Sequence, residues 1–203
     1  FPSRLRGICD SWGALHFWCV TRLLGMTIEI TGHQPTGPAF FAIKHEAAFE
    51  AIDLPYRYDF PAAFAKKELF DIPGWGRAGR TYGLIPVYRD EGAKALRMML
   101  KQARPRIKEG RPIIIFPEGG RNMTDDPILP FKAGLYNLGL ARPDVDLVPT
   151  WVANLTSIMP KGEVIPLPLI CTVTFGTPIH VADGESTDDF LRRAEHALVA
   201  LKP

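Results

Sequence analysis

A histidine and a glutamate five positions apart stand where the chain changes from a predicted strand to a predicted helix. The apolar run Ala39–Ile43 favours a buried strand, Lys44 and His45 follow it, and helix-forming residues come next. Residues five apart in a regular helix lie about 140° apart around the axis, so His45 and Glu50 meet only if His45 lies in the turn. A carboxylate bonded to an imidazole fixes its tautomer and makes it a usable general base. A single histidine in a turn is more often structural, so the pair needs support from elsewhere.

Two adjacent lysines follow another predicted strand. Lys66 and Lys67 come directly after residues 61–65 and open a predicted helical segment that Pro73 and Gly74 interrupt. A helix N-terminus already carries partial positive charge, so two lysines there are favourable only if an anion binds beside them. A solvated helix start without a ligand is the alternative for this pair.

A glycine pair between an acid and a base follows the most apolar predicted strand, residues 111–116. The segment is Glu118, Gly119, Gly120 and Arg121. Two glycines permit a tight turn with positive φ angles, but a plain turn does not require the two charged residues. Because ligands bind at the carboxyl ends of strands in open α/β sheets, the three polar groups predict one site for an anionic substrate.

The rest of the chain alternates between strand-like and helix-like segments. This alternation predicts an α/β fold with a mostly parallel central sheet flanked by helices. The predicted strands are residues 26–30, 39–43, 61–65, 84–87, 111–116, 146–153 and 171–176. The predicted helices are residues 8–24, 46–56, 91–108, 132–140 and 188–201, and residues 155–168 are predicted as a loop.

Composition excludes several classes of function. The net charge is only +2, and no arginine-rich stretch has interleaved aromatic residues, which argues against a nucleic-acid partner. The three cysteines, Cys9, Cys19 and Cys171, have no CxxC spacing. They predict free thiols rather than a disulfide scaffold or a zinc site. No cluster of carboxylates in the sequence predicts a metal ion.

The first 24 residues predict an amphipathic helix that is distinct from the domain that follows. We expect two units, residues 1–24 and residues 25–203. Trp12 and Trp18 suit a membrane interface, and packing of this helix on the core of the domain is the alternative. No run approaches the roughly 18 apolar residues of a membrane-spanning helix. Because the chain begins at Phe1 rather than at a methionine, we expect it to be trimmed, and an upstream anchor is not excluded.

Four segments, in order, resemble the motifs of the 1-acyl-sn-glycerol-3-phosphate acyltransferase family, which belongs to the glycerolipid and lysophospholipid acyltransferases. The first family motif is His, four residues and Asp, to which residues 45–50 are similar. The second, Lys-x-Glu-Leu followed by Pro and Gly, is similar to residues 66–76. The third, Phe-Pro-Glu-Gly-Thr-Arg, is similar to residues 116–121, and the fourth, a Val-Pro segment in a strand, is similar to residues 148–149.

The resemblance extends from about Leu24 to Ile179, and the chain departs from the motifs at two positions. Glu50 stands where the family has Asp, and its extra methylene lengthens the reach by about 1.5 Å. Gly120 stands where the family has Thr, which removes a hydroxyl group. Because neither change removes a charge, we expect activity to be retained.

The resemblance implies a reaction for the histidine. His45 would remove the proton from the free hydroxyl of lysophosphatidic acid, and that oxygen would attack an acyl thioester to give phosphatidic acid. Glu50 would orient His45 and stabilise its charged form. No enzyme nucleophile is needed, because the acceptor hydroxyl attacks directly.

The resemblance also implies a binding site for the acceptor. Lys66 and Arg121 would hold its phosphate, with Arg121 suited to a bidentate contact. Glu118 would bind glycerol hydroxyls or hold Arg121 in place. The N–H groups of Gly119 and Gly120 would contact either the phosphate or the oxyanion.

The partners follow from the same resemblance. The acyl donor would be acyl-CoA or acyl carrier protein, with no cofactor and no metal ion. A lysophospholipid acceptor implies a membrane surface, and we expect attachment to the cytoplasmic face, in bacteria that of the inner membrane. Another lysolipid such as a lyso-ornithine lipid, glycerol-3-phosphate, a thioesterase reaction and a non-catalytic lipid-binding domain remain alternatives.

Overall fold

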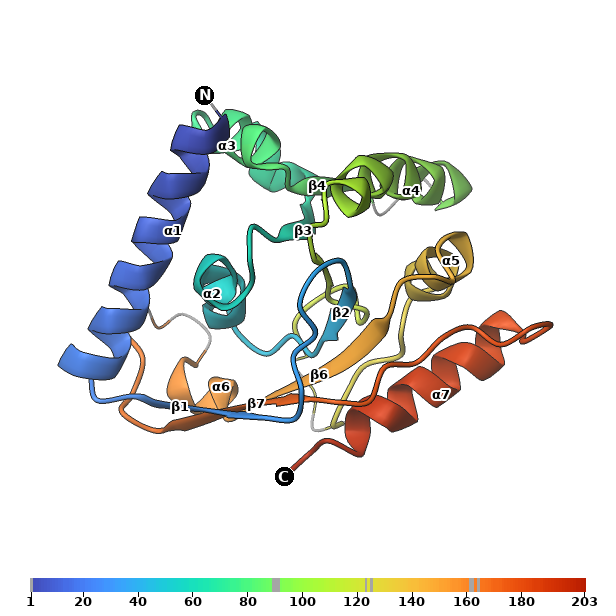
Figure 1. Cartoon of the computed structure of the whole chain (residues 1–203). Coiled ribbons are helices and arrows are strands. Elements are labelled where there is room, and N and C mark those ends of the chain that lie inside the picture. The colour runs from blue at the N-terminus through green and yellow to red at the C-terminus, as the bar shows by residue number, and fades with distance from the viewer. Residues whose placement is uncertain (1, 89–91, 123, 125, 161–162, 164) are drawn as a thin grey trace.

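The computed structural model describes residues 2–88, 92–122, 124, 126–160, 163 and 165–203, and within them seven strands form one sheet (Figure 1). The strands are β1 (Thr27–Thr31), β2 (Phe40–Ile43), β3 (Ala62–Lys66), β4 (Ile85–Val87), β5 (Ile113–Ile115), β6 (Leu147–Ala153) and β7 (Ile170–Phe175). Their order is β1-β7-β6-β2-β5-β3-β4. Strands β6 and β7 pair antiparallel, and the other described pairings are parallel. The predicted α/β fold with a mostly parallel sheet is confirmed.

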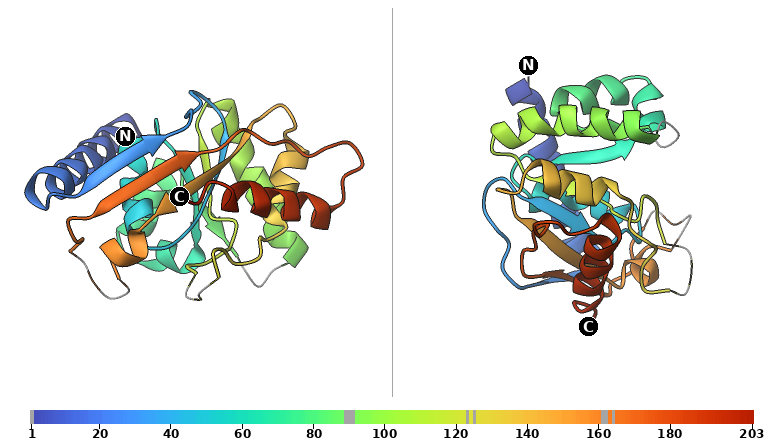
Figure 2. Two further views of the ribbon diagram at one scale, coloured as in Figure 1. Left: turned by 90° about the horizontal axis from the view of Figure 1, so that it is seen from below. Right: turned by 90° about the vertical axis from the view of Figure 1, so that its right-hand side faces the viewer.

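Helices cover both faces of the sheet (Figure 1, Figure 2). They are α1 (Pro2–Trp18), α2 (Phe49–Arg57), α3 (Trp75–Tyr82), α4 (Gly92–Lys108), α5 (Gly134–Ala141), α6 (Leu155–Ile158) and α7 (Thr187–Val199), with a π-helical turn η1 (Cys19–Leu23) and a 3₁₀ helix η2 (Lys67–Asp71). One apolar core lies between the sheet and α4, α5 and α7, and a second lies between the sheet and α2, α6 and η1.

The fully apolar strands contribute to both cores. In β2, Phe40 and Ala42 point into the core beside α5 and α7, whereas Phe41 and Ile43 point into the core beside α2. Alternate side chains of a strand face opposite sides of the sheet, so a strand covered on both sides must be apolar throughout. This explains why β2 and β5 lack the alternation of polar and apolar residues that an exposed face produces.

The register of the central strands brings three segments to one edge of the sheet. Strand β5 lies between β2 and β3, with Ala42 opposite Ile115 and Ala63 opposite Ile114. All three strands run in the same direction, so their carboxyl ends lie together. This edge therefore carries the residues that follow β2, those that follow β5 and the end of β3. These are the three polar segments that the sequence predicted to form one site.

Helix α2 begins later than the predicted residues 46–56. Its first residue is Phe49. The preceding backbone turns instead around the Glu50 carboxylate, to which Glu46 and Ala47 donate their N–H groups. A side chain that accepts backbone N–H groups favours a turn over a continued helix. His45 thus lies outside α2, which is the condition under which it can meet Glu50.

Other boundaries also differ from the predictions. Helix α1 begins at Pro2, ahead of the predicted residues 8–24, and ends in η1. The predicted loop at residues 155–168 contains the short helix α6. Lys66 is the last residue of β3 and not the first of a helix. The predicted helix from residue 91 is α4, and residue 91 itself lies outside the described residues.

Helix α1 packs along α2 at a close approach. A Cβ atom on the buried Gly13 would lie 3.0 Å from the Tyr56 backbone nitrogen. The Phe17 ring stacks on the Tyr56 ring with centroids 4.0 Å apart, and His16 contacts Phe49 at 5.3 Å. The division into residues 1–24 and 25–203 stays a prediction, because this packing alone does not define a separate unit.

Candidate active site

His45 and Glu50 form a hydrogen-bonded pair at the carboxyl edge of the sheet. The distance from His45 Nδ1 to Glu50 Oε1 is 3.0 Å. The imidazole stacks on the Phe116 ring with centroids 4.3 Å apart, so the residue after β5 supports one side of the ring. The His45 side chain remains 19% exposed, whereas that of Glu50 is 4% exposed. With Nδ1 held by the carboxylate, Nε2 is the nitrogen that remains to exchange a proton with a ligand.

The Glu50 carboxylate also organises the turn that carries His45. Its Oε1 accepts the Glu46 N–H at 2.5 Å and the Ala47 N–H at 3.0 Å, and its Oε2 accepts the Ala47 N–H at 3.0 Å. Hydrogen bonds from backbone N–H groups stabilise the ionised carboxylate and fix its position. The longer side chain of Glu50 thus extends from the first turn of α2 back to the backbone N–H groups of Glu46 and Ala47.

Glu118 fastens the His45 turn to two other segments. Its Oε1 accepts the His45 N–H at 3.2 Å, and its Oε2 accepts the Leu129 N–H at 2.7 Å. Burial raises the pKa of the Glu118 carboxyl, while the hydrogen bonds from Leu129 and His45 act in the opposite direction. Both oxygens are already engaged with backbone, which favours a positioning role over the predicted contact with glycerol hydroxyls or with Arg121.

The two glycines after Glu118 differ in what their backbones do. Gly119 has φ of +75°, and it donates its N–H to the Phe116 carbonyl at 3.0 Å. That N–H closes the turn, and the use of the Gly119 and Gly120 N–H groups on the substrate stays a prediction. Lys132 is a cation to which the sequence assigned no role in the site, and its side chain lies 3.3 Å from where a Gly119 Cβ would stand.

Both predicted phosphate ligands lie at the same edge as His45. Lys66 ends β3 and is exposed. Arg121 is exposed, and the next residue, Asn122, donates its N–H to the His45 carbonyl at 3.2 Å. Neither cation has an ion pair with another of the described residues. The structure therefore places two exposed positively charged residues at the same edge of the sheet as His45, and their contact with a phosphate stays a prediction.

The burial and the contacts of Lys44, next to His45, were not predicted from the sequence. Lys44 is 7% exposed, forms an ion pair with Glu46 and lies over the Trp151 ring at 4.2 Å. Glu46 also accepts the Thr156 N–H at 3.2 Å. These contacts tie the end of β2 to β6 and α6. No spacing rule indicates the contacts with Trp151 and Thr156, because these partners are about 110 positions away in the chain and meet Lys44 and Glu46 only in the folded protein.

The described residues contain no group of three or more His, Cys, Asp or Glu side chains that could hold a metal ion. The predicted absence of a metal ion and of a cofactor stays a prediction. The chemistry available at this edge is that of an imidazole paired with a carboxylate, beside cations and backbone donors.

Comparison with known proteins shows the family to which the chain belongs. The family model described as Acyltransferase matches residues 27–153, which is more than half of the chain and includes every predicted site residue. The chain belongs to the acyltransferase family. The family resemblance and the enzyme class predicted from the motifs are confirmed.

Curated relatives of this acyltransferase carry a more specific name. A 1-acyl-sn-glycerol-3-phosphate acyltransferase of Helicobacter pylori is 33% identical over 117 residues, covering 57% of this chain and 49% of that protein. A protein of the same name from Pseudomonas aeruginosa is 28% identical over 195 residues, covering 91% of this chain and 71% of that protein. The match thus spans about half the length of the first relative.

A solved structure has the same fold. The 1-acyl-sn-glycerophosphate (LPA) acyltransferase PlsC from Thermotoga maritima superposes with a TM-score of 0.73 at 19% identity. The superposition covers 98% of this acyltransferase and 79% of that chain. At this identity the likeness establishes the fold alone.

Proposed function

We propose that this acyltransferase moves an acyl group from an acyl thioester to the free hydroxyl of lysophosphatidic acid and so makes phosphatidic acid. The observation that carries the proposal is the His45–Glu50 hydrogen bond of 3.0 Å at an edge that also presents Lys66 and Arg121. A base for a hydroxyl and cations for a phosphate are the two things that this acceptor requires. The names of the curated relatives support the same acceptor.

The reaction follows from the state of the His45 ring. Nε2 removes the proton from the acceptor hydroxyl while the hydroxyl oxygen forms a bond to the thioester carbonyl carbon. The resulting tetrahedral oxyanion collapses, the C–S bond breaks, and the leaving thiolate takes the proton from the imidazolium. Glu50 stabilises the imidazolium between these two steps. Gly120 offers an N–H group for the oxyanion or for the phosphate.

The function is tested by supplying lysophosphatidic acid and labelled acyl-CoA, and in parallel labelled acyl carrier protein, to the purified protein. We expect labelled phosphatidic acid with at least one donor. If product forms only with glycerol-3-phosphate or a lyso-ornithine lipid, that compound is the acceptor in place of lysophosphatidic acid. Free labelled fatty acid would indicate a thioesterase, and lipid binding without any product would indicate a binding domain.

Arg121→Ala is expected to raise the KM for lysophosphatidic acid by about 10- to 100-fold and to change kcat little. The reason is that a guanidinium–phosphate contact strengthens binding in the ground state and in the transition state alike. Steady-state kinetics with each substrate varied in turn measure the effect, and Arg104→Ala, an exposed arginine on α4, is the control. A rise in the KM of acyl-CoA alone would assign Arg121 to the phosphates of the donor instead.

Attachment to a membrane surface is the second part of the proposal. Helix α1 packs one side on α2 and leaves a row of apolar side chains exposed, with exposures of 49–65%. The row comprises Ile8, Trp12, Leu15 and Trp18, and Leu23 in η1 continues it. Large apolar and indole side chains on one side of a helix bind well at the boundary of a bilayer. No helix within the described residues is long and apolar enough to cross a membrane.

Leu15→Ser is expected to weaken binding to phospholipid vesicles about tenfold, because burial of a leucine side chain in the bilayer boundary is lost. The matched control is Leu140→Ser on α5, on the other side of the sheet, since the two leucines are 58% and 55% exposed. Vesicle co-sedimentation measures both. Equal loss with Leu140→Ser, or no vesicle binding by the unmodified protein, would contradict attachment through α1.

A further inference from the structure

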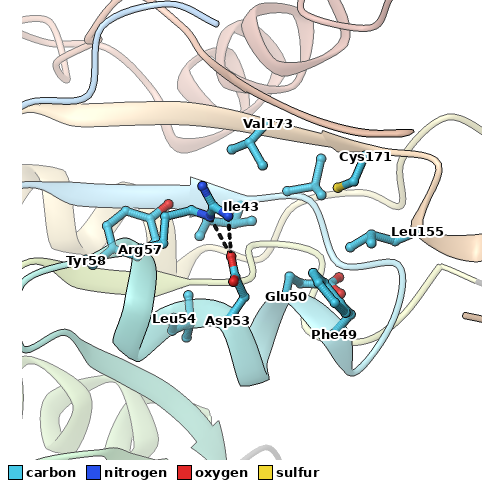
Figure 3. A pocket seen from close by; sticks show the side chains of 11 residues that line it. Ile43, Phe49, Glu50, Asp53, Leu54, Arg57, Tyr58, Leu155, Cys171 and Val173 are labelled. Carbon is cyan, nitrogen blue, oxygen red and sulfur yellow. Dashed lines mark hydrogen bonds and ion pairs between the residues drawn. The ribbon is translucent and has the colours of Figure 1, made fainter. Parts of the chain in front are cut away.

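Helix α2 turns a charged side toward an apolar core. Glu50, Asp53 and Arg57 are spaced three and four residues apart, which places them on one side of the helix. Their side chains are 4%, 5% and 7% exposed, so all three are nearly excluded from water. Figure 3 shows Asp53 and Arg57 between α2 and the sheet, with Glu50 one turn earlier on the same helix. Leu54 on this helix belongs to the surrounding core.

The Asp53–Arg57 pair uses only one of the two carboxylate oxygens. Arg57 Nε and Nη2 both lie 2.6 Å from Asp53 Oδ2. Asp53 Oδ1 is buried and accepts no hydrogen bond from the described residues. A cavity of about 20 Å³ lies between this pair, Glu50 and Cys171. This volume suits a single water molecule, for which Asp53 Oδ1 is an acceptor.

Burial of these charges needs a reason other than stability. Removing an ion pair from water costs about as much as the attraction returns, and apolar residues of the same size often stabilise a protein as well or better. Two buried carboxylates one helical turn apart also repel each other unless a cation offsets the repulsion. Arg57 is the cation that lies against this side of α2.

We infer that Asp53 and Arg57 are positioning residues for the His45–Glu50 pair: Arg57 offsets the charge of Asp53 on the same side of α2 as Glu50, and the two together set the charge felt by His45. The inference rests on the proposed role of His45 as the base. It concerns how the base is held ready and not which acceptor it serves.

Titratable groups from neighbouring elements interact with this cluster or with His45. His16 of α1, Tyr58 after α2 and Cys171 of β7 interact with the α2 charges, and Glu46 after β2 donates its N–H to Glu50. Lys44 and Glu118 lie beside His45 instead. Burial raises the pKa of the Cys171 thiol to about 12, with Arg57 acting against the rise and Asp53 and Glu50 adding to it. Burial lowers the pKa of His16, and Asp53 opposes that change. The charges of Asp53, Arg57 and Glu50 thus affect the pKa values of neighbouring groups.

The test is the protonation of the His45 ring, followed by NMR as a function of pH in variants that change one charge each. Asp53→Asn removes a negative charge, so the imidazolium is less favoured and the His45 midpoint moves to lower pH. Arg57→Gln removes a positive charge, so the midpoint moves to higher pH. We expect about half a pH unit in each direction. The His45 signal is assigned by its loss in His45→Gln, since the chain has five histidines.

The acidic limb of the pH–rate profile is expected to move in the same directions. Turnover at pH 7 falls by up to about threefold in Arg57→Gln, because a midpoint half a pH unit higher leaves less of the His45 imidazole free to accept a proton. The double variant Asp53→Asn/Arg57→Gln is expected to recover most of that turnover and to return the midpoint toward its original position. Asp188→Asn and Arg192→Gln on α7, beyond the opposite face of the sheet, repeat each charge change as controls.

Midpoints that stay fixed, or that move in the same direction in both single variants, would overturn the inference. Arg57→Gln buries an unpaired carboxylate and is the variant most at risk of unfolding. If it does not fold, Asp53→Asn has the same shape as the native residue and carries the test alone through its shift to lower pH. The NMR midpoint requires no substrate, so failure of this inference is distinguishable from a wrong acceptor.

Discussion

Replacing His45 by alanine is expected to reduce the formation of phosphatidic acid by about 10³-fold or more. The imidazole is the group that the proposed mechanism uses to remove the hydroxyl proton, with Nδ1 held by Glu50 at 3.0 Å and the ring supported by Phe116. A positioned general base contributes about 10²- to 10⁴-fold, and here the same group must also return the proton to the thiolate. The measurement is the initial rate with labelled acyl donor at saturating acceptor.

The matched control for this variant is His33→Ala, which removes an exposed histidine outside the site. We expect full activity from the control and binding of lysophosphatidic acid by both variants, because the cations that would hold the phosphate are unchanged. Phosphatidic acid formed at an undiminished rate by His45→Ala would refute a mechanism with His45 as the base. Loss of lipid binding together with activity would instead point to a collapsed site.

The sequence predicted those features that depend on neighbouring residues. The apolar segments of β2 and β5 indicated buried parallel strands, since only strands covered on both faces lack polar alternation. The position of His45 in a strand-to-helix turn likewise follows from local residue types. The pairing of His45 with Glu50 was conditional on where α2 begins, and the structure supplies that start at Phe49.

The contacts that hold the site together were not predictable in the same way. Glu118 joins the His45 backbone to Leu129, and the Lys44 ammonium lies over the Trp151 ring. His45 is 73 positions from Glu118, and Trp151 is likewise far from Lys44 in the chain, so these two contacts depend on the strand order and the register of the sheet. The sequence around a glutamate does not show whether its carboxylate is buried and accepts backbone N–H groups or faces a substrate. Burial and partners in the folded state are what separate the two roles of Glu118.

The motif position at which this chain departs from its family gives the second large effect. Glu50→Gln is expected to lower kcat by about 10³-fold, while the KM of both substrates changes little. The amide keeps the length of the side chain, and its oxygen still accepts the N–H groups of Glu46 and Ala47. What it loses is the negative charge that stabilises the imidazolium and selects the tautomer of His45, an effect of this order in other histidine–carboxylate pairs.

Glu50→Asp makes the complementary change, because it keeps the charge and shortens the reach by about 1.5 Å. From its present backbone position an aspartate is unable to keep both the 3.0 Å contact to His45 Nδ1 and the N–H groups of the turn. We therefore expect a loss of about 10- to 100-fold in kcat, smaller than that of Glu50→Gln, with the thermal midpoint of unfolding as the control for folding. Full activity in Glu50→Asp would mean that the start of α2 shifts toward His45 and restores the contact with the shorter side chain. The glutamate would then be an interchangeable variant of the motif, and the charge of residue 50 rather than its length would be what the reaction requires.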